Sequence, residues 1–408
     1  MIDKSTIKIL ILDDEPFMLK LLARMLANQG FIHVVCCDNG KDALAQLNVE
    51  STRPDLILLD LNMPGMDGIE FIRYLVERQF IGSLILVSGE DERMLKTTER
   101  LVQAHKIALL GYLQKPVKPD ALQAMLAQWL PPSTVAPAKP RKTYSPDELK
   151  LAINKGELVN YYQPKVSVAT GAVIGVETLV RWQHVTDGLV FPNQFITVAE
   201  SNGLINELTR LVLLNAFTQA KLWQQSGMEL RVAVNVSMDN LASLDFQDLV
   251  VDLATQVGIS PHKIVLEVTE SQLMRDMRVS LEILTRLRLK RFHLSIDDFG
   301  TGHSSLAQLR DIPFDELKID QGFVHQAWRD DTLRVIYDAS LALAKQLNME
   351  TVAEGVEDRQ DWDFLRQTGC DLAQGNFISK PLLASEFEDW IKYWQRRVKT
   401  DLIVDQID

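Results

Sequence analysis

Short apolar segments alternate with amphipathic segments along most of the chain, and this alternation restricts the fold more than any other feature of the sequence. The apolar segments have the length and composition of strands, and longer segments between them, such as INELTRLVLLNAFTQAKLWQQ, have helical spacing. Strands separated by helices form mainly parallel sheets, because each parallel connection has to cross over the sheet. The sequence therefore predicts an α/β protein.

A proline-rich segment divides this pattern into two parts. Residues 131–143, PPSTVAPAKPRKT, mix proline with small and basic residues, which predicts a stiff, extended linker. A chain of 408 residues is long enough for two or three domains. We therefore expect one domain over residues 1–130, a second over 144–396, and a loose C-terminal tail over 397–408.

The first part contains five strand-like segments: IKILILDD, HVVCCD, PDLILLDL, SLILVSG and ALLGYLQKP. Five β/α units predict a doubly wound, flavodoxin-like sheet, in which functional groups lie at the C-terminal ends of the strands. Polar residues stand at these ends: Asp13 and Asp14, Asp60, Ser88 and Lys115. Three carboxylates at one edge repel one another unless a hard cation lies among them. An aspartate beside such a cation can attack phosphorus, with Lys115 pairing the phosphoryl oxygens.

The second part contains eight strand-like segments: LVNYYQPKVS, AVIGVETLVR, LRVAVNVS, KIVLEVTE, FHLSIDD, FDELKID, METVAEG and DLAQGNF. Eight strands in about 250 residues predict a (β/α)₈, TIM-like barrel, whose active site lies at the C-terminal face. Six of these strands carry a polar residue at or near the end: Glu177, Asn235, Glu267, Asp297, Lys318 and Glu354. One such residue is usually a cap or a turn. Six of them indicate a site.

Two adjacent aspartates, Asp297 and Asp298, interrupt the stretch RFHLSIDDFGTGHSSL at residues 291–306. A solvated turn is one explanation, because Asp and Gly are common in turns. A metal site is the other, because a divalent cation removes the cost of crowding carboxylates. Oxygen ligands without a histidine cluster favour Mg²⁺ or Mn²⁺. Two such ions about 4 Å apart can promote a displacement at phosphorus, with Lys318 orienting water or neutralising charge.

Composition and charge exclude several classes of protein. A hydrophobic fraction of 46% and a charged fraction of 24% are typical of a soluble globular protein. We find neither a run of about 18 apolar residues nor a signal peptide, so we expect a cytoplasmic protein without a membrane partner. A net charge of −12 argues against a nucleic-acid partner. Cys36, Cys37 and Cys370 lack disulfide or metal-ligand spacing and are expected to be free thiols.

The first part resembles the receiver domains of two-component response regulators. The resemblance rests on Asp13–Asp14, the loop DLNMPGMDG at 60–68, Ser88 before Gly89, and Lys115–Pro116. It implies that Asp13, Asp14 and Asp60 bind one Mg²⁺ or Mn²⁺ and that a cognate sensor histidine kinase leads to phosphorylation of Asp60. It also implies three switch residues: Ser88, Tyr112 and Lys115. One departure is the segment at 88–111, which is long for the fourth helix and its loops. The alternative to a phosphorylated receiver is a receiver fold that serves only as a docking platform.

The second part resembles the EAL family of cyclic di-GMP phosphodiesterases over roughly residues 144–395. The motifs that carry this resemblance are YQPK (162–165), ETLVRW (177–182), NVS (235–237), EVTE (267–270), DDFGTG (297–302), KID (318–320), AEGVE (353–357) and QG (374–375). The resemblance implies hydrolysis of cyclic di-GMP to linear pGpG by two metal ions, Mg²⁺ or Mn²⁺. It also implies a homodimer or higher homo-oligomer.

The resemblance assigns a role to each site residue. Metal ligands would be Glu177, Asn235, Glu267 and Asp297 for one ion, and Asp297, Asp298 and Glu354 for the other. Lys318, with Glu354, would activate the water, while Asp320 would support solvent at the metals and Glu270 would brace the DDFGTG loop. Residues expected to contact the nucleotide are Gln163, Leu179, Arg181 and Gln374.

Some positions depart from the EAL pattern without removing a metal ligand: Thr178 within ETL, Val185 after His184, His303 after DDFGTG, and Asn376 after QG. A catalytically silent cyclic di-GMP sensor that acts through protein partners is therefore the alternative function. A barrel glycosidase fits less well, because its two acids flank a sugar bond about 5–9.5 Å apart and would give Asn235 and Lys318 no task.

Overall fold

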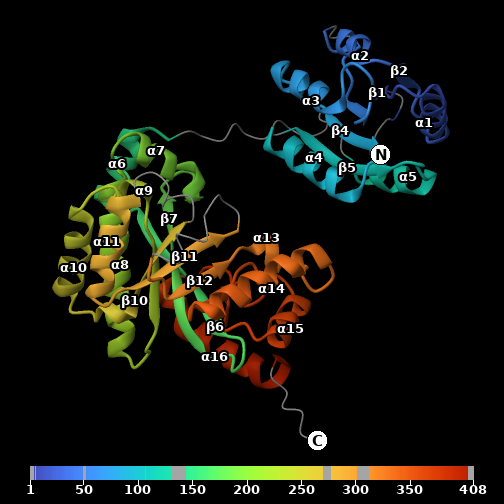
Figure 1. The fold of residues 1–408 in the computed structure, drawn as a ribbon. Coiled ribbons are helices and arrows are strands. Elements are labelled where there is room, and N and C mark those ends of the chain that lie inside the picture. Colours follow the sequence, from blue (N-terminus) through green and yellow to red (C-terminus); the bar gives the residue numbers. More distant parts are fainter. Residues whose placement is uncertain are drawn as a thin grey trace, which may run out of the picture. The chain divides into compact units, whose positions relative to one another are not determined.

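A computed structural model of the chain describes residues 4, 6–48, 52–105, 107–129, 144–269, 277–300 and 312–402. The chain forms two compact units, residues 1–141 and 142–408, and each is described by itself (Figure 1). The linker predicted at 131–143 lies outside the described residues. Among the helices that are described, none has both the length and the apolar character needed to cross a membrane.

The first unit is a parallel five-stranded sheet between two layers of helices. Its elements are β1 (Lys8–Leu12), α1 (Pro16–Asn28), β2 (His33–Cys37), α2 (Gly40–Leu47), β3 (Leu56–Asp60), α3 (Gly68–Glu77), β4 (Ser83–Ser88), α4 (Glu92–Ala104), β5 (Ala108–Gln114) and α5 (Pro119–Gln128). The strand order is β2-β1-β3-β4-β5, with every pairing parallel. The predicted doubly wound sheet is confirmed, and all strands end at one edge.

Separate hydrophobic clusters cover the two faces of this sheet, one under α2, α3 and α4 and one under α1 and α5. The long segment at 88–111 contains a 13-residue helix, α4, so its length needs no unusual feature. Cys36, Cys37 and Cys370 are free thiols, as predicted.

The second unit is an eight-stranded barrel surrounded by helices (Figure 1). Its strands are β6 (Leu158–Ser167), β7 (Val173–His184), β8 (Gly188–Val190), β9 (Arg231–Asn235), β10 (Ile264–Thr269), β11 (His293–Phe299), β12 (Glu316–Ile319), β13 (Glu350–Ala353) and β14 (Leu372–Ala373). Its α-helices are α6 (Pro146–Lys155), α7 (Ile196–Ser201), α8 (Ile205–Gln225), α9 (Met238–Leu241), α10 (Asp245–Val257), α11 (Met277–Leu289), α13 (Gln321–Val324), α14 (Asp331–Gln346), α15 (Arg359–Thr368) and α16 (Phe387–Arg397). Short helical turns are η1 (Pro192–Gln194), η2 (Pro261–Lys263), η4 (Ala384–Glu386) and η5 (Val398–Leu402).

Pairing of β6 with both β7 and β14 closes the barrel. The short strand β8 is not part of the closed ring and pairs antiparallel with the end of β7. All eight predicted strands are present. The direction of the first one differs from a regular (β/α)₈ barrel, because β6 runs antiparallel to both of its neighbours. The connection between β6 and β7 spans only residues 168–172, which is too short for a helical crossover and forces a hairpin.

The beginning of the predicted tail is ordered in helices. Residue 397 ends α16, and η5 follows it directly. Val398 and Leu402 are buried, and the Leu402 carbonyl accepts a hydrogen bond of 2.9 Å from Arg366 Nη1. Residues 397–402 therefore belong to the folded part of the second unit, because the side chains of Val398 and Leu402 are buried in its hydrophobic core.

The barrel has a charged interior and an apolar exterior. On β10, Ile264, Leu266 and Val268 belong to the hydrophobic core under the helices, and Glu267 alternates away from that core. Leu317 on β12 likewise packs outward between two inward charges. Since successive strand side chains point to opposite faces, the period of two separates core residues from site residues.

Candidate active site

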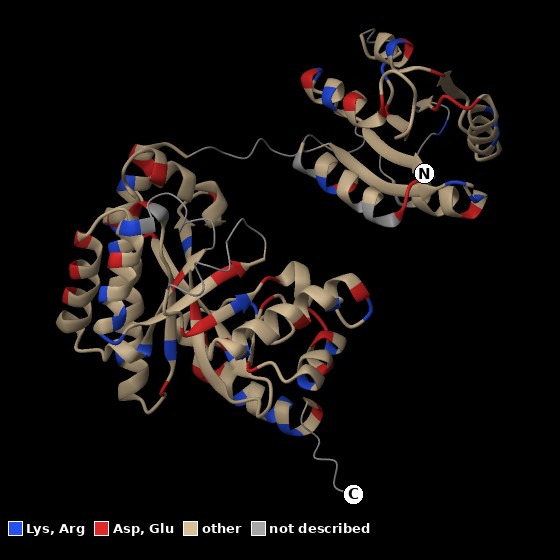
Figure 2. Cartoon of the chain, in the orientation of Figure 1, with Lys and Arg blue, Asp and Glu red and all other residues tan. Residues whose placement is uncertain are grey.

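Charged side chains from neighbouring strands meet inside the barrel near the C-terminal ends of the parallel strands. Figure 2 shows acidic and basic residues together on these central strands. The six polar residues predicted at or near the strand ends lie here: Glu177 on β7, Asn235 at the end of β9, Glu267 on β10, Asp297 on β11, Lys318 on β12 and Glu354 directly after β13. The predicted convergence at one mouth is what the structure contains.

Lys318 occupies the centre of the mouth. Its side chain is 1% exposed, and its Nζ lies 2.6 Å from Glu354 Oε1, 2.9 Å from Asp297 Oδ1, 3.3 Å from Glu267 Oε2 and 3.5 Å from Glu177 Oε2. One ammonium group therefore holds four carboxylates together. A buried charge of this kind is stable only when it is well paired.

Amide groups complete the other side of the mouth. Glu177 accepts a hydrogen bond of 2.8 Å from Asn235 Nδ2 and a second one from Gln374 Nε2. The Gln374 amide also donates to Gln163 Oε1 at 3.0 Å, and Gln163 Nε2 donates to the Ser379 carbonyl at 3.1 Å. Gln374 Oε1 is buried and has no hydrogen-bond partner among the described residues, so one acceptor remains for a donor on a ligand.

A polar cleft of about 410 Å³ opens above these groups. Its lining includes the four predicted nucleotide contacts, one predicted metal ligand and one predicted catalytic residue: Gln163, Leu179, Arg181, Gln374, Asp298 and Asp320. Arg181 is half-buried with its guanidinium 5.1 Å from the centre of the Phe191 ring. Asp320 caps α13 by accepting a hydrogen bond from the Gly322 amide at 2.8 Å.

Asp297, Asp298 and Glu354 form a group suited to a divalent cation. One carboxylate oxygen from each lies within 4.8 Å of the others. Asp298 has a φ of +54°, a left-handed conformation that costs energy in most residues and often occurs at functional sites. Its amide donates to Asp297 Oδ1 at 3.0 Å. Hard oxygen donors in a confined group are the ligand set for Mg²⁺ or Mn²⁺.

Crowding of these acids raises their affinity for protons. Burial raises the pKa of Glu354 to about 8, with Asp297 adding to the rise and Lys318 opposing it. Burial, followed by the charges of Asp297 and Asp320, raises the pKa of Asp298 to about 6. These two predicted metal ligands thus have raised pKa values, chiefly because they are buried and secondly because other acids lie close to them.

The deeper carboxylates respond differently to the two lysines of the barrel. Burial alone would raise the pKa of Glu177, but Lys318 and Lys165 outweigh it and lower the value to about 2. Burial dominates at Glu267 and raises its pKa to about 7 despite the same two lysines. The pKa of Lys318 rises well above its usual value, because the carboxylates outweigh its burial.

Sequence reasoning missed a second buried ion group below the mouth. Lys165 on β6 is 3% exposed, and its Nζ lies 2.7 Å from Glu267 Oε1 and 2.7 Å from Glu316 Oε1. Ser295 Oγ also donates to Glu316 Oε1 at 2.9 Å. The two lysines thus face five buried or half-buried carboxylates, which leaves three negative charges unbalanced when all are ionised. This excess fits bound divalent cations.

The signal for these two residues was present in the sequence. Lys165 follows Gln163 by two residues, and Glu316 precedes Lys318 by two, so each shares a strand face with a predicted site residue. Glu270 and His303 lie outside the described residues.

The second candidate site lies at the C-terminal edge of the sheet in the first unit. Asp13, Asp14 and Asp60 bring one carboxylate oxygen each within 4.8 Å of one another. Lys115 Nζ lies 2.8 Å from Asp60 Oδ2 and 2.9 Å from Asp13 Oδ2. Burial raises the pKa of Asp13, and the two paired aspartates outweigh burial to raise the pKa of Lys115. These residues fit one divalent cation.

The other two predicted switch residues, Ser88 and Tyr112, lie on β4 and β5. Ser88 ends β4 and is fully buried, its carbonyl accepts a hydrogen bond of 2.9 Å from the Lys115 amide, and its Oγ accepts one of 3.2 Å from the Glu90 amide. Tyr112 on β5 is half-buried against the hydrophobic cluster under α2 to α4. On the sheet, Ser88 lies on β4, directly next to the strand that carries Asp60, and Tyr112 lies one strand farther away, on β5.

Comparison with known proteins identifies both units. The EAL domain family matches residues 147–381, and the response regulator receiver domain family matches residues 9–127. The chain belongs to the EAL family and carries a receiver domain. The eight-stranded barrel is thus the EAL domain, and the doubly wound sheet is the receiver domain.

The similar proteins include one that matches almost the whole chain and one in which the matched EAL domain is part of a longer protein. The cyclic di-GMP phosphodiesterase RocR of Pseudomonas aeruginosa is 30% identical over 388 residues, which cover 95% of this chain and 99% of RocR. The bifunctional diguanylate cyclase/cyclic di-GMP phosphodiesterase MucR of the same organism is 41% identical over 240 residues, 59% of this chain and 35% of MucR. A solved structure of the PaMucR phosphodiesterase with c-di-GMP has a TM-score of 0.57 at 40% identity, covering 59% of this chain and 98% of that chain.

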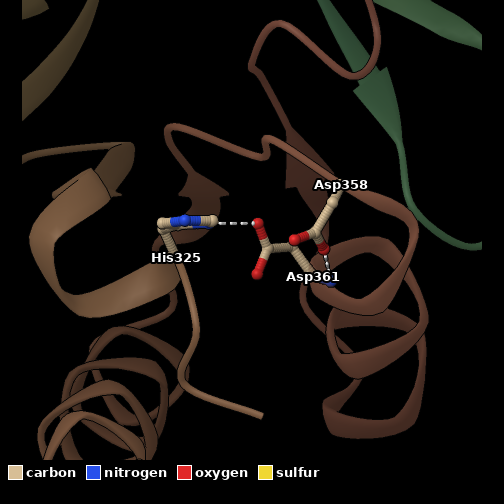
Figure 3. A group of neighbouring side chains, drawn as sticks. All are labelled: His325, Asp358 and Asp361. Carbon is tan, nitrogen blue, oxygen red and sulfur yellow. Dashed lines mark hydrogen bonds and ion pairs between the residues drawn. The ribbon is translucent and has the colours of Figure 1, made fainter. Parts of the chain in front are cut away.

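A third group of potential metal ligands in the EAL domain has a structural role. Figure 3 shows His325, Asp358 and Asp361 close together, with ligand atoms within 4.8 Å. The buried Asp361 carboxylate accepts hydrogen bonds from His325 Nδ1 at 2.8 Å, the Gln326 amide at 3.0 Å and the Glu357 amide at 3.1 Å. Asp358 accepts one from the Asp361 amide at 2.9 Å. Asp361 therefore ties the loop after β12 to the loop after β13.

Replacing Asp361 with Ala is expected to destabilise the EAL domain. The substitution leaves the partly buried amides of Gln326 and Glu357 without this partner, and an unpaired buried donor costs about 1–3 kcal/mol. The free energy of unfolding should fall by roughly 2–5 kcal/mol in urea titrations followed by tryptophan fluorescence. Asp363→Ala on the same helix removes only an exposed pair with Arg359 and should cost less than about 1 kcal/mol. Equal losses in the two variants would contradict this role of Asp361.

Proposed function

We propose that the chain hydrolyses cyclic di-GMP to linear pGpG, using two divalent cations at the mouth of the EAL barrel. The observation that carries this proposal is the cluster of four carboxylates around Lys318, continued by Asp298 at the cleft. RocR and MucR, whose names include cyclic di-GMP phosphodiesterase, are similar across this domain. In this reaction the oxygen of a water molecule forms a bond to one phosphorus, and the bond between that phosphorus and O3′ breaks. A proton from the water ends on O3′.

The cations would be held by residues that the geometry already groups. Glu177, Asn235, Glu267 and Asp297 supply donors around one position, and Asp297, Asp298 and Glu354 supply them around another. When bound, such ions supply Lewis acidity toward a phosphoryl oxygen and lower the pKa of a water molecule. Mg²⁺ and Mn²⁺ both fit oxygen donors, and the excess negative charge favours their binding.

Protein groups would do the remaining work. Lys318 is positively charged and contacts four of the five proposed ligand carboxylates, so it can neutralise charge that develops on the phosphoryl oxygens. The carboxyl of Glu354 lies 2.6 Å from Lys318 Nζ, and once it has lost its own proton its raised pKa of about 8 suits it to accept a proton from water. Asp320 faces the same cleft and can orient solvent there. Glu270 keeps its predicted bracing role.

The nucleotide would lie in the polar cleft. Arg181 offers a guanidinium for phosphate oxygens, and Gln374 Oε1 offers the free acceptor for a donor on the nucleotide. Gln163 holds the Gln374 amide in place, and Leu179 supplies an apolar surface for a base. We propose these four as the substrate contacts.

The direct test is hydrolysis of cyclic di-GMP by the purified full chain with Mg²⁺ or Mn²⁺, with pGpG quantified by chromatography. Asp297→Asn preserves shape but removes a ligand charge shared by both metal positions, and it should lower kcat by at least about a hundredfold. Asp338→Asn, an exposed position on α14, is the matched control and should leave kcat unchanged. Absence of pGpG from the wild-type protein at every metal concentration would remove the proposal.

The same assay separates the alternative function, a silent sensor. A sensor binds cyclic di-GMP without turnover and transmits the bound state to protein partners. This chain keeps every acidic ligand of the mouth and Lys318, which a protein without turnover does not need. Tight binding of cyclic di-GMP without pGpG would favour the sensor.

Metal binding should strengthen as pH rises. Asp298 and Glu354 have metal-free pKa values raised to about 6 and about 8, so below those values each must lose a proton before it binds a cation. Calorimetric titration with Mn²⁺ should give an affinity at pH 8.5 at least about tenfold higher than at pH 6.5, with more protons released at the lower pH. In Glu354→Gln the dependence should shrink. A Mn²⁺ affinity that is the same at pH 6.5 and pH 8.5 would contradict the assignment of Asp298 and Glu354 as metal ligands.

We propose in addition that phosphorylation of Asp60 regulates the EAL domain. Asp60 is 3% exposed and paired to Lys115, and together with Asp13 and Asp14 it fits one divalent cation beside the acceptor carboxylate. Lys115 and Ser88 are placed near Asp60 to pair and hydrogen-bond a new phosphoryl group, and Tyr112 lies on the adjacent β5. A sensor histidine kinase is the proposed phosphodonor, and the homo-oligomer stays a prediction.

Acetyl phosphate with Mg²⁺ should form one hydroxylamine-labile acyl phosphate on the wild-type chain and none on Asp60→Asn. The rate of cyclic di-GMP hydrolysis should change by at least about twofold only in the wild type, because phosphate adds charge to the receiver surface. Asp67→Asn, the exposed cap of α3, is the control and should respond like wild type. Phosphorylation without any change in rate would contradict the regulatory proposal and leave the acceptor role intact.

A further inference from the structure

The ion group beneath the mouth of the barrel has geometry that the reaction does not explain. Lys165 and Glu316 are both 3% exposed, and neither belongs to the lining of the cleft. The ammonium group of Lys165 lies 2.7 Å from Glu316 and 2.7 Å from Glu267, which is fully buried. Burying three charges is costly, so a group like this is retained where it serves a purpose.

The Glu267 carboxylate is held by one lysine at each oxygen. Oε1 of Glu267 points to Lys165, and Oε2 lies 3.3 Å from Lys318 at the mouth. Within the described part of the chain, these two lysines are the only hydrogen-bond partners of the carboxylate. With one oxygen held from below, the other is presented to the position where Glu267 meets the remaining acids.

Glu316 in turn holds Lys165. Its Oε1 accepts from Lys165 Nζ at 2.7 Å and from Ser295 Oγ at 2.9 Å. The cavity beside Lys165 and Glu316 measures only about 10 Å³, enough for no more than one water molecule. Lys165 therefore has no room for another position. The ammonium group is fixed between two strands that carry acids on one face.

We propose that Lys165 is a positioning residue for metal binding: held by Glu316, it orients Glu267 so that one oxygen is available at the mouth. This inference rests on the proposed function, in which Glu267 is a metal ligand. It assigns Lys165 no contact with substrate or metal. Its effect reaches the cation through Glu267 alone, so it should appear first in metal affinity.

The test compares Lys165→Met, Glu316→Gln and the double variant with wild type, as full chains. Mn²⁺ binding is measured from the free-ion signal in electron paramagnetic resonance, and thermal unfolding is measured on the same samples. The receiver cluster binds equally in every variant, so differences report on the barrel. Lys165→Met should weaken Mn²⁺ binding by at least about tenfold, as expected for loss of a group that orients a ligand. Glu316→Gln keeps Lys165 beside Glu267 and should change affinity less than about threefold.

The double variant separates positioning from charge balance. Replacing Glu316 as well removes the carboxylate that Lys165→Met leaves unpaired, so the double variant should regain much of the lost thermal stability. Its Mn²⁺ affinity should stay as weak as that of Lys165→Met, because Glu267 still lacks its lower partner. This variant also carries the test if Lys165→Met alone does not fold.

Wild-type Mn²⁺ affinity in the double variant would overturn the proposal, since Lys165 would then serve only to offset Glu316. Hydrolysis measured on the same proteins keeps the two proposals distinguishable. A wild-type chain that binds Mn²⁺ without producing pGpG would refute the proposed function, while the comparison of affinities would still decide the role of Lys165.

Discussion

Two buried lysines contact five carboxylates inside the EAL barrel. The arrangement of the site follows from this excess of negative over positive charge. Lys318 gathers four acids at the mouth, while Lys165 holds one of them from below. Burial, together with the neighbouring acids, raises the pKa of Asp298 to about 6 and that of Glu354 to about 8. A folded domain tolerates such an excess when cations complete it, as the cost of leaving buried charges unpaired is high.

The direction of β6 decides which residue lies at which depth. Because β6 runs antiparallel to β7, Gln163 pairs with Glu177 near the mouth and Lys165 pairs with Gly175 farther in. A parallel first strand would reverse that order and place the ammonium group at the cleft. The short hairpin at 168–172 therefore separates an amide that faces the cleft from a lysine that supports Glu267.

Most of the fold and the site could be predicted from the sequence, because strands with a period of two ended in polar residues. That pattern predicted eight barrel strands and the convergence of Glu177, Glu267 and Lys318. It did not predict the direction of β6, which depends on the length of one connection. It also missed Lys165, since a lysine in the middle of a strand has no marker of burial until its partners from other strands are known.

The most direct test of this account is the position of the metal in a crystal of the full chain grown or soaked with Mn²⁺. Anomalous scattering should show two peaks at the barrel mouth, one bounded by Glu177, Asn235, Glu267 and Asp297 and one by Asp297, Asp298 and Glu354. A mouth without anomalous density at saturating Mn²⁺, with Glu267 and Asp297 turned away from each other, would contradict the claim that these acids are gathered to hold cations.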